Sequence, residues 1–325
     1  MLNNQEQFKK LISDSKNILV CFNNGKDIDQ VASSLAIANF LQKYNKQVEI
    51  VCENYQLIKN IKHLKDYDKI KNKISNLQKL IVKVDLSHAK VETLSYDIRD
   101  NWLYIYLNPK TGTITKNDLR TAQTALKYDL IISIGAQDLN SLGEIFTNNT
   151  DLFYNVPIIN IDNRSGNEEY GQINYCELKA IANSEIVLDI IKKIDETKLD
   201  KETATSILTG MIWATRSFKT GIITPNILNK ASDLIAIGAN RNLIIKNLYQ
   251  TKTIAALKLW GKALTRLKQE DAIGLVWTFL DSHDFADAKA DRQDLNDIIE
   301  ELISNSPEAK MTLLMSPMPH QVLGV

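Results

Sequence analysis

The first 52 residues carry a strand–helix–strand pattern, and no other feature of the sequence restricts the fold as strongly. Residues 17–22 (NILVCF) form a short apolar run bounded by polar residues, which predicts a buried strand. The sequence also predicts a helix over 28–44 and a second strand over 47–52. Two strands joined by one helix within about 35 residues form a parallel βαβ unit, so we expect an α/β fold.

Similar strands recur along the chain. Their apolar and β-branched composition predicts strands at 80–84, 102–107, 129–134 and 156–161. A turn is expected at 108–112 because proline and glycine lie there. Residues 182–267 are mostly helical in pattern, and beyond them we expect a strand at 272–279, an amphipathic helix at 292–304 and a strand at 311–314. We therefore predict a doubly wound, mostly parallel α/β domain over 1–245, a helical connector over 246–269 and a small α/β domain over 270–325.

The loops after the predicted strands indicate where a ligand would bind. In open α/β sheets, ligands lie beyond the carboxyl ends of the strands. The relevant loops follow Phe22, Ile134 and Ile161. We therefore expect the functional residues to lie in these three loops.

Composition excludes several classes of protein. The three cysteines are far apart and the four histidines form no H-x-x-x-H pair, so a disulfide framework and a zinc hydrolase site are not expected. The formal net charge is zero, which argues against binding a polyanion through overall charge. No apolar run approaches the roughly 20 residues of a membrane helix, and the N-terminus does not resemble a signal peptide. We therefore expect a cytoplasmic protein without a membrane segment.

Four loop segments carry a resemblance to a known family. They are NNGKDID at 23–29, Gly135 after its strand, IDNR at 161–164 with Asn167 and Tyr170-Gly171 behind it, and LTG at 208–210 with ATRSF at 214–218. In this order and spacing the chain resembles the DHH/DHHA1 phosphoesterases, which include RecJ-like and nano-RNase-like enzymes. The resemblance covers most of the chain. It implies a DHH-like domain, a DHHA1-like C-terminal domain and phosphoester hydrolysis with two Mn²⁺ or Mg²⁺ ions.

The resemblance also shows which functional positions differ from the family. The retained carboxylates are Asp27 and Asp29 of the first motif and Asp162 of the third. The replaced positions, where the family has histidine or a metal-binding aspartate, are Asn23, Gly135, Asn163, Arg164 and Ala214. A rival alignment places the second motif at residues 80–85, ending in Asp85, but the spacing to the third motif favours Gly135. The glycine-rich segment with which the DHHA1 domain normally grips its substrate is missing, so we expect a truncated DHHA1-like domain.

These replacements predict that the two-metal site is dismantled. Glycine and alanine offer no side-chain ligand, so Asp27 and Asp29 would hold at most one weak Mg²⁺ or Mn²⁺, and no cofactor is expected. We interpret the chain as a pseudoenzyme that binds a nucleotide, a short single-stranded RNA or a protein partner. The alternative is a weak or altered metal-dependent phosphoesterase that acts on short RNA or nucleotides.

Three cations are expected close to the retained carboxylates. Arg164 and Arg216 replace neutral or metal-binding groups of the family, and Lys26 lies beside Asp27. One hypothesis is that Lys26, Asp162, Arg164 and Arg216 line a metal-free pocket in which the arginines bind a phosphate. The other, which we favour, is that both arginines form ion pairs with Asp27 and Asp29 and fill the vacated space.

Residues 80–116 are predicted to form an inserted β-hairpin. Period-two alternation in WLYIYL places Trp102, Tyr104 and Tyr106 on one face of a strand. The opposite face carries Leu103, Ile105 and Leu107. The aromatic face could stack bases or contact a protein, and an uncovered face favours association. We therefore expect a homodimer or a protein partner bound through the hairpin.

Overall fold

The computed structural model describes residues 4–74, 80–123, 126–221, 223–250, 253–295, 298 and 309–316. The chain divides into two compact units, Met1–Ile244 and Ile245–Val325. Among the residues just given, no helix is both long and apolar enough to cross a membrane.

The first unit is built on a five-stranded parallel sheet, as the sequence predicted. Its strands, in spatial order, are β2 (Gln47–Val51), β1 (Asn17–Phe22), β7 (Leu130–Ile134), β8 (Ile158–Asp162) and β9 (Ile173–Cys176). Ile18 of β1 pairs with Val48 on one side and Leu130 on the other. Strand β9 was not predicted, because the four residues INYC lack the apolar run by which the other strands were recognised.

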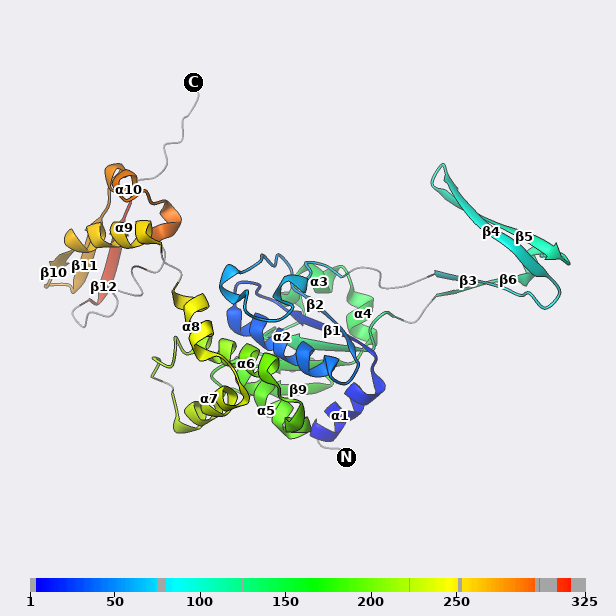
Figure 1. The fold of residues 1–325 in the computed structure, drawn as a ribbon, viewed down its shortest axis with the longest axis horizontal. Coiled ribbons are helices and arrows are strands. Elements are labelled where there is room, and N and C mark those ends of the chain that lie inside the picture. Colours follow the sequence, from blue (N-terminus) through cyan, green and yellow to red (C-terminus); the bar gives the residue numbers. More distant parts are fainter. Residues whose placement is uncertain are drawn as a thin grey trace, which may run out of the picture. The chain divides into compact units, whose positions relative to one another are not determined.

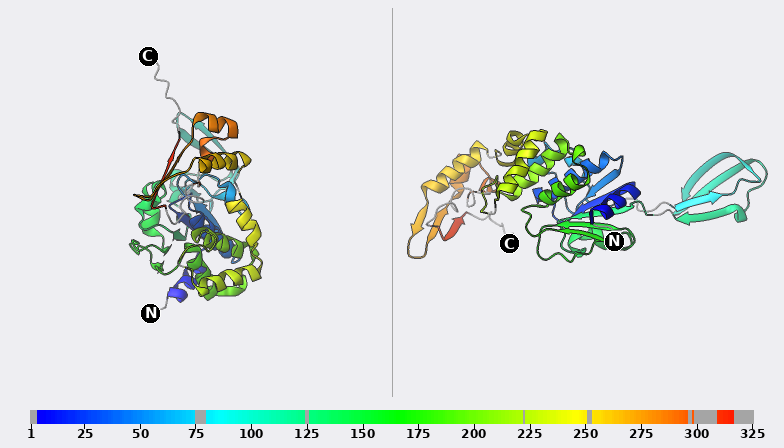
Figure 2. Two further views of the ribbon diagram at one scale, coloured as in Figure 1. Left: turned by 90° about the vertical axis from the view of Figure 1, so that its left-hand side faces the viewer. Right: turned by 90° about the horizontal axis from the view of Figure 1, so that it is seen from below.

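Helices cover both faces of this sheet (Figures 1 and 2). The helices of the first unit are α1 (Asn4–Asp14), α2 (Ile28–Gln42), α3 (Glu144–Thr147), α4 (Thr150–Asn155), α5 (Asn183–Asp195), α6 (Lys201–Ala214) and α7 (Pro225–Ile237). Helix α2 contacts β1, β2 and β7 on one side and α5 and α6 on the other, so it is buried along almost its whole length. Helices α3 and α4 pack on the opposite face, where Phe146 and Phe153 meet edge to face.

The strand order reverses between β1 and β7. From β1 the chain moves outward to β2, whereas from β7 it moves through β8 to β9 in the opposite direction. The loops that follow β1 and β7 therefore leave the carboxyl edge of the sheet in opposite directions. The sequence predicted the same edge as the ligand-binding region.

Residues 80–123 form an inserted ribbon of two antiparallel strand pairs. Strand β3 (Leu80–Val84) pairs with β6 (Leu119–Gln123), and β4 (Lys90–Arg99) pairs with β5 (Trp102–Thr111). The predicted hairpin is thus present, but it extends beyond residue 116. Because β3 lies outside the central sheet while β7 lies beside β1, the structure supports Gly135 rather than Asp85 as the second motif.

The turn predicted at 108–112 was wrong. Strand β5 continues to Thr111, and Pro109 pairs with Val91 where the register of the ribbon shifts. A two-stranded ribbon has open edges, so a proline without an N–H group can be accommodated there. The turn lies instead at Asp100 and Asn101, whose φ values of +47° and +64° fit the type I′ turn of a tight hairpin.

The second unit is a small α/β body. Helix α8 (Arg241–Tyr249) spans the boundary between the units, and the remaining elements are α9 (Ile254–Thr265), β10 (Lys268–Glu270), β11 (Leu275–Phe279), α10 (Ser282–Ala288) and β12 (Met311–Met315). The three strands form one sheet in the order β10-β11-β12. Leu259 and Trp260 of α9 belong to the core of this unit, so the predicted connector packs into the C-terminal body. Of the helix predicted at 292–304, Arg292–Leu295 form a 3₁₀ turn, and most of the rest lies outside the described residues.

Candidate functional site

Asp27 begins helix α2 at the carboxyl edge of the sheet. Its Oδ1 accepts a hydrogen bond from the backbone N–H of Asp29 at 3.0 Å, so it is the N-cap of the helix. Burial raises the pKa of Asp27 to about 6, and the neighbouring charge of Asp29 acts in the same direction. The positive charge of Arg164 opposes this shift. Asp27 is thus a half-buried carboxyl group that takes up a proton near neutral pH.

Asp29 connects helix α2 to the start of helix α5. Its carboxylate is buried and accepts hydrogen bonds from the backbone N–H groups of Asn183 and Ser184 at 2.7 and 3.1 Å. The Ser184 hydroxyl donates at 2.6 Å and the Asn183 amide at 3.1 Å. Ala182, at the N-cap position of α5, makes no side-chain bond, so Asp29 caps this helix from a distant part of the chain. Burial raises the pKa of Asp29, and the hydrogen bonds from Ser184 and Asn183 oppose the shift.

Gly210 allows helix α6 to approach this cap. A Cβ atom at Gly210 would lie 2.6 Å from Ser184 Oγ and 2.7 Å from Asp29 Oδ1, closer than normal contact. Only glycine therefore lets α6 pack at this distance. Gly210, the glycine of the predicted fourth motif, therefore has a structural role, because it makes room for the Asp29 carboxylate.

Gln30 fills the space beside Gly135. Its amide accepts from the N–H of Asn24 at 3.2 Å and donates to the carbonyl of Gly135 at 3.3 Å, so it bridges the loops after β1 and β7. Gly135 has φ +64°, and a Cβ atom there would lie 2.7 Å from the Gln30 side chain. The point where the family has an aspartate is thus occupied by a neutral amide from helix α2.

Asp162 holds the loop that follows β8. It is fully buried and accepts from the N–H of Asn163 at 2.9 Å, from Arg164 Nε at 3.2 Å and from Asn167 Nδ2 at 3.0 Å. Asn167 also donates to the carbonyl of Ala136 and so ties this loop to the one after β7. Arg164 thus pairs with Asp162, whereas an ion pair with Asp27 or Asp29 was expected.

The segment after helix α6 has unusual backbone geometry. Arg216, Ser217 and Phe218 have φ values of +48°, +61° and +62°, in the left-handed region that disfavours side chains. The Thr215 hydroxyl accepts from the N–H of Phe218 at 3.0 Å and thereby closes the turn. Arg216 stands where the family has a glycine, so the chain keeps the turn without the residue suited to it. Ala214, at the metal-ligand position, ends the helix.

The structure also places a polar group, His63, that no sequence pattern indicated. His63 Nε2 lies 3.2 Å from the Thr209 hydroxyl on helix α6, and burial lowers the pKa of His63 to about 4. Near Asp27 and Asp29, the amide oxygens of Asn23 and Asn183 are buried and lack a hydrogen-bond partner within the described chain. His63 had no signal in the sequence, because only the fold brings its loop to α6.

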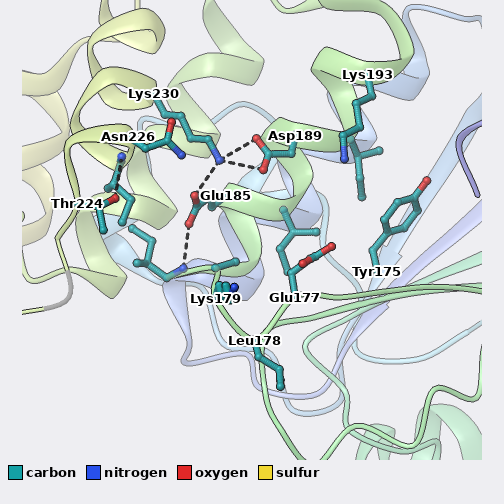
Figure 3. A pocket seen from close by; sticks show the side chains of 15 residues that line it. Tyr175, Glu177, Leu178, Lys179, Glu185, Asp189, Lys193, Thr224, Asn226 and Lys230 are labelled. Carbon is teal, nitrogen blue, oxygen red and sulfur yellow. Dashed lines mark hydrogen bonds and ion pairs between the residues drawn. The ribbon is translucent and has the colours of Figure 1, made fainter.

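A cavity of about 510 Å³ lies behind the same helix start. Lys230 of α7 bridges Glu185 and Asp189 of α5 at 2.8 Å each, and the second oxygen of Glu185 accepts from the N–H of Ile181 at 2.9 Å (Figure 3). The cavity is lined by several residues between Tyr175 and Lys193 and by the start of α7. None of the predicted site residues lines it, so this cavity is separate from the predicted site.

Comparison with known proteins defines the class. The DHH family, N-terminal domain, matches residues 17–211, and the chain therefore belongs to the DHH family of phosphoesterases. Over 108 residues it is 27% identical to the bifunctional oligoribonuclease and PAP phosphatase NrnA of Thermus thermophilus, a match that covers 33% of each chain. The crystal structure of an exopolyphosphatase-related protein from Bacteroides fragilis has the same fold, with a TM-score of 0.68, 16% identity, and coverage of 94% of this chain and 77% of that one.

Members of this family normally use divalent metals, and the residues present here do not fit a two-metal centre. Bridging two cations requires carboxylate oxygens with free lone pairs. Asp29 and Asp162 already accept several hydrogen bonds each, and Gln30 fills the position beside Gly135. The residues described hold no cluster of three histidine, cysteine or acidic side chains suited to a metal. We derive no catalytic step through such a centre.

Replacement of Asp29 by alanine is expected to destabilise the first unit by about 3 kcal/mol, because several buried donors at the start of α5 would lose their acceptor. Asp29→Asn, which keeps one acceptor oxygen, should cost less. Urea denaturation followed by circular dichroism measures both. Asp14→Ala, at the exposed end of α1, is the control and should change stability by no more than about 0.5 kcal/mol. A cost below about 1 kcal/mol for Asp29→Ala would contradict the capping role.

The raised pKa of Asp27 predicts a pH dependence of stability. The folded state holds the proton up to about pH 6, whereas the unfolded state releases it near pH 4, so stability falls as pH rises through this window. Asp27→Asn keeps the N-cap acceptor and cannot ionise. We expect wild type to lose about 2 kcal/mol relative to this variant between pH 4 and pH 7, measured by urea denaturation at each pH. If the stabilities of wild type and Asp27→Asn changed in parallel with pH, the raised pKa of Asp27 would be refuted.

Arg216→Gly is expected to stabilise the protein by about 1 kcal/mol, because glycine adopts a positive φ without steric cost. Thermal denaturation should show a higher midpoint. The matched control is Lys219→Gly, three residues further on, where φ is not positive and glycine should be neutral or destabilising. Equal effects of both substitutions would show that the backbone at Arg216 is not strained.

Proposed function

We propose that this chain binds a nucleotide or a short oligoribonucleotide at the carboxyl edge of its sheet without hydrolysing it. One observation carries the proposal: Asp29, a carboxylate that the family motif retains, is saturated by hydrogen bonds from helix α5. A metal could bind there only if this helix cap were broken. A site without its metals loses the charge that polarises a phosphoester but keeps polar and cationic side chains that can contact the ligand.

The cations at this edge support an anionic ligand. Arg164 Nη2 is buried and has no hydrogen-bond partner among the described residues, although Nε of the same guanidinium is paired with Asp162. A buried guanidinium nitrogen without a protein partner favours an anionic acceptor such as a phosphate oxygen. Lys26 and Arg216 are exposed on the neighbouring loops. The NrnA relative, an oligoribonuclease by name, supports a ligand of this size and class.

A second candidate function rests on oxygen atoms of Asn23, Asp27 and Asn183. The unpartnered amide oxygens of Asn23 and Asn183, together with the Asp27 carboxylate, are ligands of the type that Mg²⁺ prefers. With a single weakly held ion, the protein would be a slow metal-dependent phosphoesterase. Arg164, whose charge acts on Asp27, disfavours a cation here. We therefore place this candidate second.

Binding of a 5′-fluorescein-labelled triribonucleotide, followed by fluorescence anisotropy, tests the proposal. We expect binding by wild type and a loss of 10- to 100-fold in affinity for Arg164→Ala, because a charged hydrogen bond contributes about 1.5–3 kcal/mol. Arg241→Ala, an exposed arginine at the start of α8, is the control and should bind like wild type. Unaltered binding by Arg164→Ala, or no binding by wild type, would overturn the proposal.

The same RNA incubated with Mn²⁺ separates the two candidates. We expect no cleavage above the level of an Asp27→Ala sample prepared in parallel. Cleavage by wild type that is lost in Asp27→Ala would establish the metal-dependent enzyme instead.

A further inference from the structure

Where Leu94–Ile98 pair with Leu103–Leu107, the β4–β5 part of the inserted ribbon has one face without a charged side chain. Opposite residues of an antiparallel pair point to the same side, and the register pairs Leu94 with Leu107, Tyr96 with Ile105, and Ile98 with Leu103. We call these six residues the apolar face. Five of them are strongly exposed, with exposed fractions from 46% for Ile105 to 71% for Tyr96.

The opposite face of β4 and β5 mixes polar and aromatic side chains. It carries Ser95, Asp97 and Arg99 across from Tyr106, Tyr104 and Trp102. Arg99 pairs with Asp97, and the rings of Tyr104 and Tyr106 stack with centroids 6.4 Å apart. A ribbon with charged side chains on one face and none on the other has the pattern of a sheet whose uncharged side is covered. An isolated two-stranded hairpin is marginally stable in water, so a cover would also stabilise the ribbon.

The chemistry of the apolar face excludes two kinds of cover. A protein surface that binds a nucleic acid needs lysine or arginine side chains to contact the phosphate backbone, and the apolar face has neither. A membrane-inserted hairpin would lead with apolar residues, whereas the turn here consists of Asp100 and Asn101. An uncharged protein surface remains as the cover.

We propose that the apolar face binds the same face of a second copy of this chain, so that two ribbons pack into a four-stranded sandwich. The exposed part of the face amounts to about 600 Å² per copy, at the upper end of the largest patch on a typical monomer. Two such faces together bury about 1,200 Å², the lower limit for a specific interface. The face is self-complementary because both of its strands present aliphatic side chains, as a two-fold symmetric contact requires.

Charge does not oppose this pairing. Residues 80–123 contain six basic side chains (Lys83, Lys90, Arg99, Lys110, Lys116 and Arg120) and five acidic ones (Asp85, Glu92, Asp97, Asp100 and Asp118), so two ribbons do not repel strongly. Pro109 and the shifted register near Val91 interrupt the edge of the ribbon, which favours packing through faces over edge-to-edge pairing. The interface is independent of the proposed ligand site.

Analytical ultracentrifugation of the full chain from 1 to 100 μM tests the inference with a matched pair of variants. Ile105→Asp places a charge on the apolar face, and Tyr104→Asp places the same charge on the opposite face at the adjacent position with similar exposure. We expect a wild-type dimer, a dimer with Tyr104→Asp, and a dissociation constant raised at least 100-fold by Ile105→Asp.

Three results would overturn the inference: a wild-type monomer at 100 μM, a dimer that survives Ile105→Asp, or equal loss of the dimer in both variants. Both substitutions lie in β5, so a general loss of ribbon structure would affect both variants. Loss of the interface alone would affect only Ile105→Asp. Anisotropy with the labelled triribonucleotide should be unaltered in Ile105→Asp, which keeps this test distinct from that of the ligand site.

Discussion

The hydrogen bonds of Asp29 hold the first unit together on one side of its sheet. Through this carboxylate, the start of helix α2 satisfies the backbone N–H groups at the start of helix α5, and Gly210 lets helix α6 close over them. A buried carboxylate is costly unless donors surround it, and here four donors converge from Asn183 and Ser184. The arrangement stabilises the packing of three helices and at the same time uses the lone pairs that a metal would need.

In the remainder of the carboxyl edge, other side chains likewise occupy positions where the family binds metal. Gln30 occupies the space beside Gly135, and Arg164 pairs with Asp162, so neutral amides and a guanidinium group stand where the family binds cations. Under the proposed function, such a site would bind a phosphate through the guanidinium group without the metal charge that polarises a phosphoester.

Much of the fold followed from periodicity. The apolar runs of β1, β7 and β8 were recognisable because strands buried on both faces need apolar side chains at successive positions. Strand β9 was missed because it lies at the edge of the sheet, where partial burial permits a mixed composition. The extent of β5 was missed because Pro109 signals a turn in most sequences, whereas an open edge tolerates it.

The sequence by itself determined the α/β class, the family and the loops that form the site, because strand patterns and motif spacing are local properties of the chain. It also indicated which ligand positions are replaced. Only the tertiary structure decided what the surviving residues do: that Asp29 caps α5, that Arg164 pairs with Asp162, and that His63 reaches α6. Asp29 and Ser184, like His63 and Thr209, lie far apart along the chain, and a hydrogen bond between distant segments depends on how helices pack, which no local pattern encodes.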